Sequence, residues 1–200
     1  MRRKSEFVRQ RISEAAYESF WRNGYTRTNV DAIAARAGVT KRTLYAYFPS
    51  KDDLLAAVLL RYGELALARL ERIGERMPAE RDSMIDAFFA QLDRWASATP
   101  RWAGSGLTRL VMELGDLPGH PARAIARRAK ATTEAWLAAR LRAANVRGER
   151  DRAREIMLLL EGAMVLTLIH GDRGYIDAAA RAAKVLVQPR LRRAGKSIDH

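Results

Sequence analysis

Two short helical patterns that meet at a glycine, within residues 28–51, constrain this sequence more than any other feature. Apolar residues recur at helical spacing from Val30 to Ala37. Gly38 follows, at the place where a helix end favours a residue with positive φ. A second pattern runs from Lys41 to about residue 48, and Pro49 ends it. Two helices joined by a short glycine turn predict a helix-turn-helix.

The ends and the exposed side of these two patterns suit a contact with DNA. Thr28, with Asp31 three residues later, has the form of a capping box for the first helix, and Thr40 can cap the second. The first turn of the second helix is the part that reaches base edges in a major groove, and nearby hydroxyl and ammonium groups can donate to phosphates. The candidate DNA-binding residues are Thr28, Thr40, Lys41, Arg42, Thr43, Tyr45, Tyr47 and Lys51. An amphipathic helix pair without a DNA role is the alternative.

The distribution of charge favours the same segment. The chain has a formal net charge of +13 and a pI of about 10.8. Residues 1–51 contain eleven basic and four acidic side chains, a net charge of +7. A basic protein favours anionic partners, which are nucleic acid or a membrane surface. The first residues, Arg2, Arg3 and Lys4, are either a disordered arm that touches DNA or a frayed terminus.

The remainder of the chain reads as helices and short loops, with no alternation typical of strands. The fold class expected is therefore all-α. One helix is expected before the helix-turn-helix, over residues 4–22. The helices expected after it cover residues 50–76, 81–98, 102–114, 121–144, 150–170 and 175–188.

Residues 12–58 resemble the DNA-binding domain of the TetR family of bacterial transcriptional regulators. The resemblance is ungapped and includes the specific run Y-x-Y-F-x-x-K, from Tyr45 to Lys51. The other matching positions are Ile12, Ala15, Ala16, Phe20, Gly24, Tyr25, Thr28, Val30, Ile33, Ala34, Ala37, Gly38, Val39, Leu44, Leu54 and Leu55.

This resemblance implies a domain organisation and a function. Residues 1–50 would form a three-helix DNA-binding domain, a linker helix would run from about 50 to 76, and residues 51–200 would form a helical effector-binding and dimerisation bundle. The chain would be a ligand-responsive repressor that binds a palindromic double-stranded operator as a dimer and is released by a small molecule. A basic helical membrane-surface binder and an unrecognised enzyme in the C-terminal bundle are the alternatives.

Bulky side chains in the middle helices are the candidates for an effector site. They are Phe88, Trp95, Trp102, Met112, Trp136 and Met164. Cavities between bundle helices commonly bind ligands against aromatic side chains, although each residue could also belong to an ordinary core. Glu113, Thr167 and His170 are the polar residues expected near them.

The last two helices, about residues 150–188, are rich in small and aliphatic residues. In the TetR family the corresponding helices of two subunits form a four-helix interface, so a homodimer is expected there. Burial of both helices inside one chain is the alternative. A reader of palindromic DNA needs a two-fold partner, which favours the dimer.

Several function classes find no support in the sequence. The chain has no cysteine, and its three histidines are far apart, so no metal site or cofactor is expected. No nucleophile elbow, P-loop or dinucleotide fingerprint appears, so no enzyme activity is expected. The basic start lacks an apolar segment typical of a signal, and no apolar run is long enough to span a membrane. A cytoplasmic location, without membrane contact, is expected.

Overall fold

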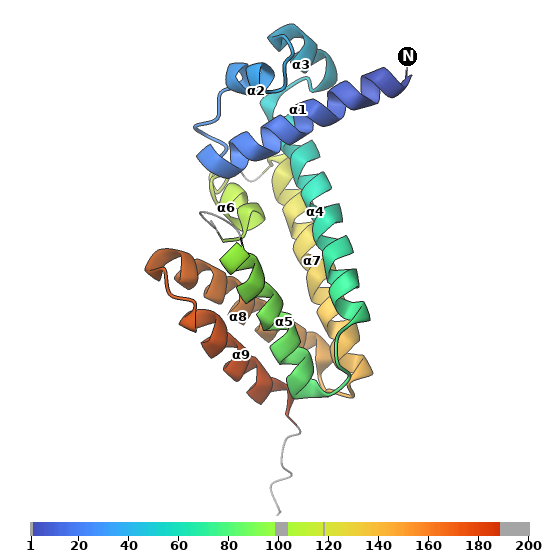
Figure 1. The fold of residues 1–200 in the computed structure, drawn as a ribbon, viewed down its shortest axis with the longest axis vertical. Helices are drawn as coiled ribbons and strands as arrows, with labels where there is room; N and C mark the ends of the chain where they lie inside the picture. The colour runs from blue at the N-terminus through green and yellow to red at the C-terminus, as the bar shows by residue number, and fades with distance from the viewer. Residues whose placement is uncertain (1, 99–103, 118, 189–200) are drawn as a thin grey trace, which may run out of the picture. The chain divides into compact units, whose positions relative to one another are not determined.

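The computed structural model describes residues 2–98, 104–117 and 119–188. Every regular element in these ranges is an α-helix (Figure 1). The helices are α1 (Arg2–Asn23), α2 (Val30–Arg36), α3 (Lys41–Tyr47), α4 (Lys51–Glu75), α5 (Arg81–Ala98), α6 (Gly106–Met112), α7 (Pro121–Ala143), α8 (Glu149–His170) and α9 (Gly174–Val187). The all-α prediction is confirmed. Within the described residues, no helix is both long and apolar enough to cross a membrane.

The chain packs as two units. One unit comprises Met1–Glu75 with Arg101–Thr133, and the other comprises Arg76–Pro100 with Glu134–His200. We call them the head unit and the tail unit. This division groups residues by their packing. The division at residue 50 that the sequence analysis expects separates functional domains, and it stays a prediction.

The head unit has one apolar core, built by α1 to α4, α6 and the start of α7. Its apolar residues follow the helical period of each element, so that each helix turns one face inward. Several of its large side chains are completely or almost completely buried, namely Ile12, Phe20, Ile33, Leu44, Phe48, Leu54, Leu55, Leu59 and Leu114. Burial of this apolar surface is the main stabilising contribution to the unit.

The tail unit is organised around α5, α8 and α9, which lie side by side in Figure 1. Ile85, Phe89 and Ile156 are almost completely buried, and the small Ala183 on α9 allows close helix contact. The Arg81 guanidinium donates hydrogen bonds to three backbone carbonyls at the C-terminal ends of α7 and α9. The acceptors are Ala144 O at 3.0 Å, Asn145 O at 2.7 Å and Val187 O at 3.4 Å. These carbonyls lack partners within their own helices, so the arginine stabilises both ends.

Some helix ends differ from the sequence-based expectation. The N-cap of α2 is Asn29, whose side chain accepts from the Asp31 N–H at 2.9 Å, and the cap is not Thr28. An asparagine carbonyl caps at least as well as a threonine hydroxyl, and Asn29 is the residue next to the first helical turn. The cap predicted at Thr40 is confirmed, since its hydroxyl accepts from the Thr43 N–H at 3.0 Å. Helix α1 already begins at Arg2, so the basic start is helical rather than a disordered arm.

Candidate nucleic-acid interface

The turn between α2 and α3 is closed by backbone hydrogen bonds around Gly38. The Val39 N–H donates to Ala34 O at 3.0 Å, and the Gly38 N–H donates to Ala35 O at 3.0 Å. This pair of bonds is a Schellman motif, which requires a left-handed residue, and Gly38 has φ of +61°. Gly38 thus has the left-handed conformation that the sequence pattern predicted for the end of the first helix.

Two arginines of α1 hold the C-terminal ends of these helices. Arg11 donates to the carbonyl of Ala37, the last residue before Gly38. Arg9 donates to the carbonyl of Tyr47 at 3.5 Å, and its guanidinium lies 4.7 Å from the centre of the Phe48 ring. A cation at a helix C-terminus stabilises the unpaired carbonyls there. Part of the positive charge counted from the sequence therefore serves the fold of the head unit.

Helix α3 leaves a donor-rich side uncovered. Leu44 and Phe48 are buried against the core, whereas Lys41, Arg42 and Tyr45 are exposed. The remaining predicted residues are exposed at Thr40 and partly buried at Thr43 and Tyr47. Figure 1 shows α2 and α3 together at one end of the head unit.

Lys41 has a partner within the head unit. Its ammonium lies 3.0 Å from an Asp31 carboxylate oxygen. The hydrogen bond from Lys41 to Asp31, reinforced by the negative charge of Asp31, raises the pKa of the lysine. No ion pair of Arg42 is found in the described part of the chain, so this guanidinium is the more available of the two cations.

Thr28 and Lys51 lie at the edges of this surface. Thr28 is buried, and its hydroxyl donates to the carbonyl of Gly24 at 2.5 Å, which gives it a structural role in the turn after α1. The Lys51 ammonium lies 4.4 Å from the centre of the Tyr25 ring. Burial lowers the pKa of Lys51, and the nearby carboxylates of Asp52 and Glu113 oppose that shift. Their contacts with DNA stay predictions.

A cluster of polar side chains lies next to Lys51, and the sequence analysis did not predict it. The Tyr25 hydroxyl donates to Asp52, and His120 Nε2 lies 3.5 Å from the same carboxylate oxygen. Burial, together with this hydrogen bond to Asp52, raises the pKa of Tyr25. The Glu113 carboxylate accepts from the Thr26 N–H at 3.0 Å. These residues lie far apart in sequence, and no local pattern signals that they meet.

The structure gathers some of the predicted effector residues and separates others. In the tail unit, the Phe88 and Trp136 rings lie 6.2 Å apart, and Met164 is buried. Trp95 is partly buried on α5. Met112 belongs to the head unit and is 73% exposed, while Trp102 lies outside the described residues. Of the polar residues expected near them, Thr167 is buried and His170 is exposed and stacks on Tyr175.

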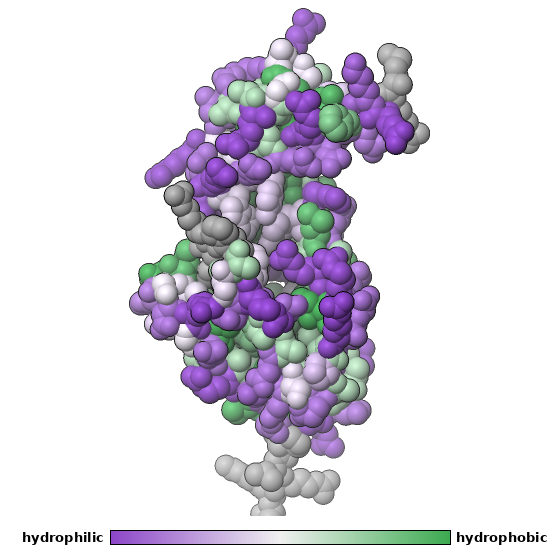
Figure 2. Space-filling view, in the orientation of Figure 1, coloured by the Kyte–Doolittle hydropathy of each residue, from purple (hydrophilic) through white to green (hydrophobic). Residues whose placement is uncertain are grey.

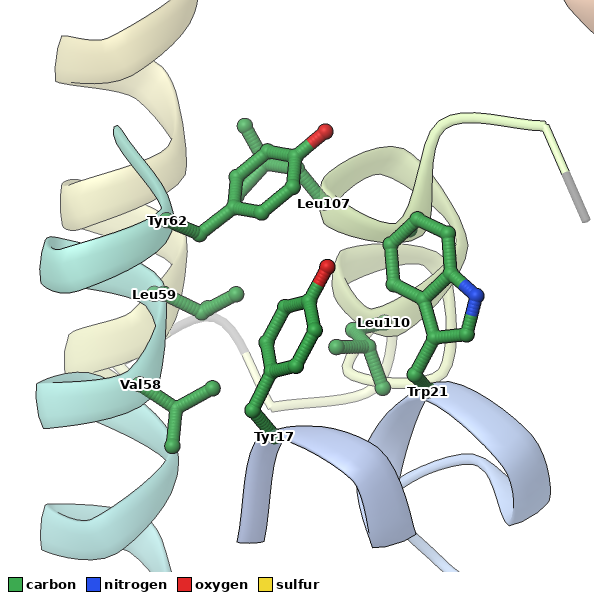
Figure 3. A pocket seen from close by; sticks show the side chains of 8 residues that line it. Tyr17, Trp21, Val58, Leu59, Tyr62, Leu107 and Leu110 are labelled. Carbon is green, nitrogen blue, oxygen red and sulfur yellow. The ribbon is translucent and has the colours of Figure 1, made fainter. Parts of the chain in front are cut away.

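The head unit has an apolar hollow of its own (Figure 3). Tyr17 and Trp21 come from α1, Tyr62 comes from α4, and Leu107 and Leu110 come from α6. The space between the side chains is about 170 Å³ when open solvent is counted, and no part of it is wide enough to hold a water molecule. No residue of the predicted effector set lines it.

Comparisons with known proteins agree with this geometry. Residues 12–58 match the family model described as bacterial regulatory proteins, tetR family. The chain is 42% identical over 57 residues to the HTH-type transcriptional repressor SCO4008 of Streptomyces coelicolor. The aligned residues are 28% of this chain and 30% of that protein. The chain is 38% identical over 69 residues to the regulator UidR of Escherichia coli K12, which covers 34% and 35%. The matches thus span about a third of these relatives.

Solved structures extend the similarity to almost the whole chain. SCO4454, a TetR-family transcriptional regulator from Streptomyces coelicolor, superposes with a TM-score of 0.80 at 22% identity, covering 91% of this chain and 95% of that one. Escherichia coli NemR in its reduced form gives 0.79 at 19% identity, covering 92% and 100%. At these identities the likeness concerns the fold. Residues 12–58 are thus a TetR-family N-terminal domain, and the described fold is that of TetR-family regulators.

Proposed function

We propose that this chain is a transcriptional repressor that binds a palindromic DNA operator as a homodimer and releases it when a small molecule binds. The observation that carries the DNA-binding part is the uncovered side of α3. This side presents Arg42 and Tyr45 on a helix that the Gly38 turn and two α1 arginines hold in place. A rigidly held helix with cationic and hydroxyl donors fits base edges and phosphates in a major groove.

The test of DNA reading is selection of bound duplexes from a random pool, with the parent and with Arg42→Ala. We expect the parent to enrich a two-fold symmetric sequence. A bidentate contact from arginine to guanine contributes about 1–3 kcal/mol of discrimination, so Arg42→Ala relaxes the preference at one position of each half-site. Binding to anionic liposomes, with no enriched duplex, would favour the membrane-surface alternative.

An exposed apolar stripe on α8 supports the homodimer. Leu158, Val165 and Ile169 are 70%, 42% and 67% exposed, and Gly162 lies between them at the same helical spacing. Val185 on α9 is 74% exposed. Figure 2 shows hydrophobic side chains at the surface in the region of α8 and α9. A contiguous apolar face left in water is costly, and a second copy of the same face is a self-complementary cover for it.

The dimer is tested by charging this stripe. We expect Leu158→Glu combined with Ile169→Glu to sediment as a monomer and to lose tight binding to a two-half-site operator. Leu60→Glu combined with Leu65→Glu is the matched control, because these α4 leucines are similarly exposed, at 48% and 54%. If the double α8 variant remains a dimer, the interface lies elsewhere.

Buried polar groups without partners in the tail unit support an effector site, and one of them, Trp136 Nε1, lies beside Phe88. Trp136 Nε1 and Thr167 Oγ1 are buried and have no hydrogen-bond partner among the described residues. Buried donors normally find an acceptor, so an unpaired indole N–H beside a second aromatic ring suits an apolar ligand that carries an oxygen acceptor.

The effector is sought by screening apolar small molecules for release of the selected operator. Trp136→Phe keeps the aromatic ring and removes only the N–H donor. We expect this variant to bind operator like the parent and to need about tenfold more of the releasing compound, as the loss of one hydrogen bond to a buried donor implies. Equal release of both proteins would place the ligand away from Trp136.

A further inference from the structure

A buried histidine closes the polar cluster of the head unit. His120, just before α7, is only 7% exposed. Its Nε2 lies 3.5 Å from Asp52 Oδ1, the oxygen that also accepts from the Tyr25 hydroxyl. The Tyr25 and His120 rings meet edge to face, with centres 5.7 Å apart. Three segments of the chain, namely the loop after α1, the first turn of α4 and the start of α7, therefore meet at this imidazole.

The other nitrogen of His120 has a different task. Its Nδ1 accepts from the Ala122 N–H at 3.1 Å and so caps the N-terminus of α7. An accepting Nδ1 carries no proton, and the proton of the neutral ring is therefore on Nε2. That Nε2–H lies 3.5 Å from Asp52 Oδ1, and Nε2 has no hydrogen-bond partner among the described residues while the ring is neutral.

Protonation of this ring changes both contacts. The added proton goes to Nδ1, where it meets the Ala122 N–H, so the cap of α7 is lost. The ring becomes a cation beside the Asp52 carboxylate, which strengthens that contact. Histidine is the side chain whose charge changes near neutral pH. The titratable and charged groups of this cluster are Asp52 and Tyr25, which touch the ring, Lys51, which lies over the Tyr25 ring, and Glu113, whose charge acts on Lys51.

We propose that His120 is a proton-dependent positioning residue: the neutral ring caps α7, and the protonated ring pairs with Asp52 and strengthens DNA binding. This inference rests on the proposed DNA-binding function. Asp52 is the residue next to Lys51, the expected phosphate contact, and its side chain is 49% exposed. Its negative charge repels a phosphate there. A cation 3.5 Å from the carboxylate offsets that charge.

Linkage fixes the direction of the effect. If the protonated protein binds DNA more tightly, DNA binding must favour protonation of His120 by the same factor. Affinity for DNA therefore rises as the pH falls and the ring takes up its second proton. One unit charge acting near a protein surface implies a change of about threefold to tenfold.

The experiment measures affinity for one fixed DNA duplex at pH 7.5 and pH 5.5, at constant ionic strength. His120→Asn is the informative variant, because asparagine can still accept the α7 cap bond but cannot be protonated. His170→Asn is the matched control, since His170 is an exposed histidine of the tail unit. We expect the parent and His170→Asn to bind about threefold to tenfold more tightly at pH 5.5, and His120→Asn to lose this gain.

A gain that His120→Asn retains would overturn the proposal. A second measurement does not need DNA: NMR of the imidazole nitrogens in the whole protein, with Asp52→Asn beside the parent. We expect the Nε2 resonance of His120 to shift in Asp52→Asn, because the group 3.5 Å from this nitrogen loses its charge, and an unchanged resonance would also overturn the pairing. If neither the parent nor His120→Asn binds DNA at pH 7.5 or pH 5.5, while the NMR result is as expected, the DNA-binding proposal fails. The His120–Asp52 pair then still stands.

Discussion

The helix-turn-helix of the head unit and the α8 helix of the tail unit treat their apolar residues in opposite ways. In the head, the periodic positions Ile12, Ile33 and Leu44 are completely buried within the same chain. On α8, Ile156 is buried, but Leu158 and Ile169 are mostly exposed. A stripe of apolar residues predicts that this side of a helix is buried. It does not tell whether the same chain or a partner buries it. The helix-turn-helix covers its own apolar stripes within the chain, whereas α8 leaves apolar surface exposed, which the proposed second copy would cover.

The polar contacts inside each unit also differ in how deeply they are buried. In the head, buried or half-buried groups such as Arg11, Tyr25 and His120 join segments distant in sequence. Apart from the Arg81 contacts, many connections within the tail unit are ion pairs with exposed members, such as Arg173 with Asp93 and Lys184 with Asp86. Exposed pairs contribute little to stability, because solvent screens them. We therefore expect the head to be more sensitive to single changes at its polar contacts.

The largest expected effect tests whether the two units are separate in stability. Phe20 in the head and Phe89 in the tail are equally buried, at 0% and 1% exposure. Replacement of either by alanine leaves a cavity and costs about 3–5 kcal/mol. In denaturant unfolding followed by circular dichroism, we expect Phe20→Ala to shift one transition and Phe89→Ala another. If both variants shift a single transition equally, the units unfold together.

The next effect concerns two helix glycines with opposite surroundings. A Cβ at Gly106 would overlap the Trp21 ring, whereas nothing lies within 4 Å of a Cβ at Gly162 on α8. We expect Gly106→Ala to cost about 1–3 kcal/mol, because the tryptophan must move. Gly162→Ala should instead gain up to about 1 kcal/mol in helix stability. Thermal unfolding measures both, and a destabilised Gly162→Ala whose dimer is weaker would mean that the partner helix packs against this glycine.

A smaller expected effect compares the removal of one lysine charge from the head unit with its removal from the tail unit. Lys51→Ala removes the expected phosphate contact, so binding to all duplexes weakens, and the slope of log affinity against log salt falls by about one. Lys184→Ala removes the same charge from the tail unit and should leave the slope unchanged. A normal slope in folded Lys51→Ala would exclude the phosphate contact.

The smallest expected effect is a pH dependence of the tail unit. Glu80 precedes α5 and accepts from the backbone N–H groups of Asp82 and Ser83 at 3.0 and 2.7 Å. Hydrogen bonds from Ser83, and then from Asp82, lower its pKa from 4.5 to about 2. A lowered carboxyl pKa gives stability that is complete above pH 4.5 and is lost as the pH falls towards 2.

Thermal unfolding at pH 5 and pH 2.5 checks this dependence. Because Glu80 is exposed, we expect only a small part of the acid destabilisation to disappear in Glu80→Gln. Glu71→Gln is the control, since it removes a carboxylate from an exposed position inside α4. Identical acid sensitivity in all three proteins would show that the α5 cap does not depend on the charge of Glu80.

Much of the fold followed from short-range patterns. The ends of α5 and α7 were placed to within about a residue, because capping residues, prolines and the helical period act over a few positions. Local reasoning erred where two neighbours could both cap, as at Thr28 and Asn29. In the candidate interface it identified the exposed side of α3, since Leu44 and Phe48 mark the opposite face. It did not find that Arg9 and Arg11 support this helix from α1.

By itself, the sequence determined that the chain is helical, that a helix-turn-helix lies around Gly38, and that the first quarter of the chain holds more than half of the net charge. These are properties of neighbouring residues and of composition. Only the tertiary structure decided that Tyr25 meets Asp52, 27 positions away, and that Thr26 meets Glu113, 87 positions away. Such contacts depend on which faces of distant helices come together. Packing selects among many pairings that are locally equivalent, and no periodicity encodes the choice.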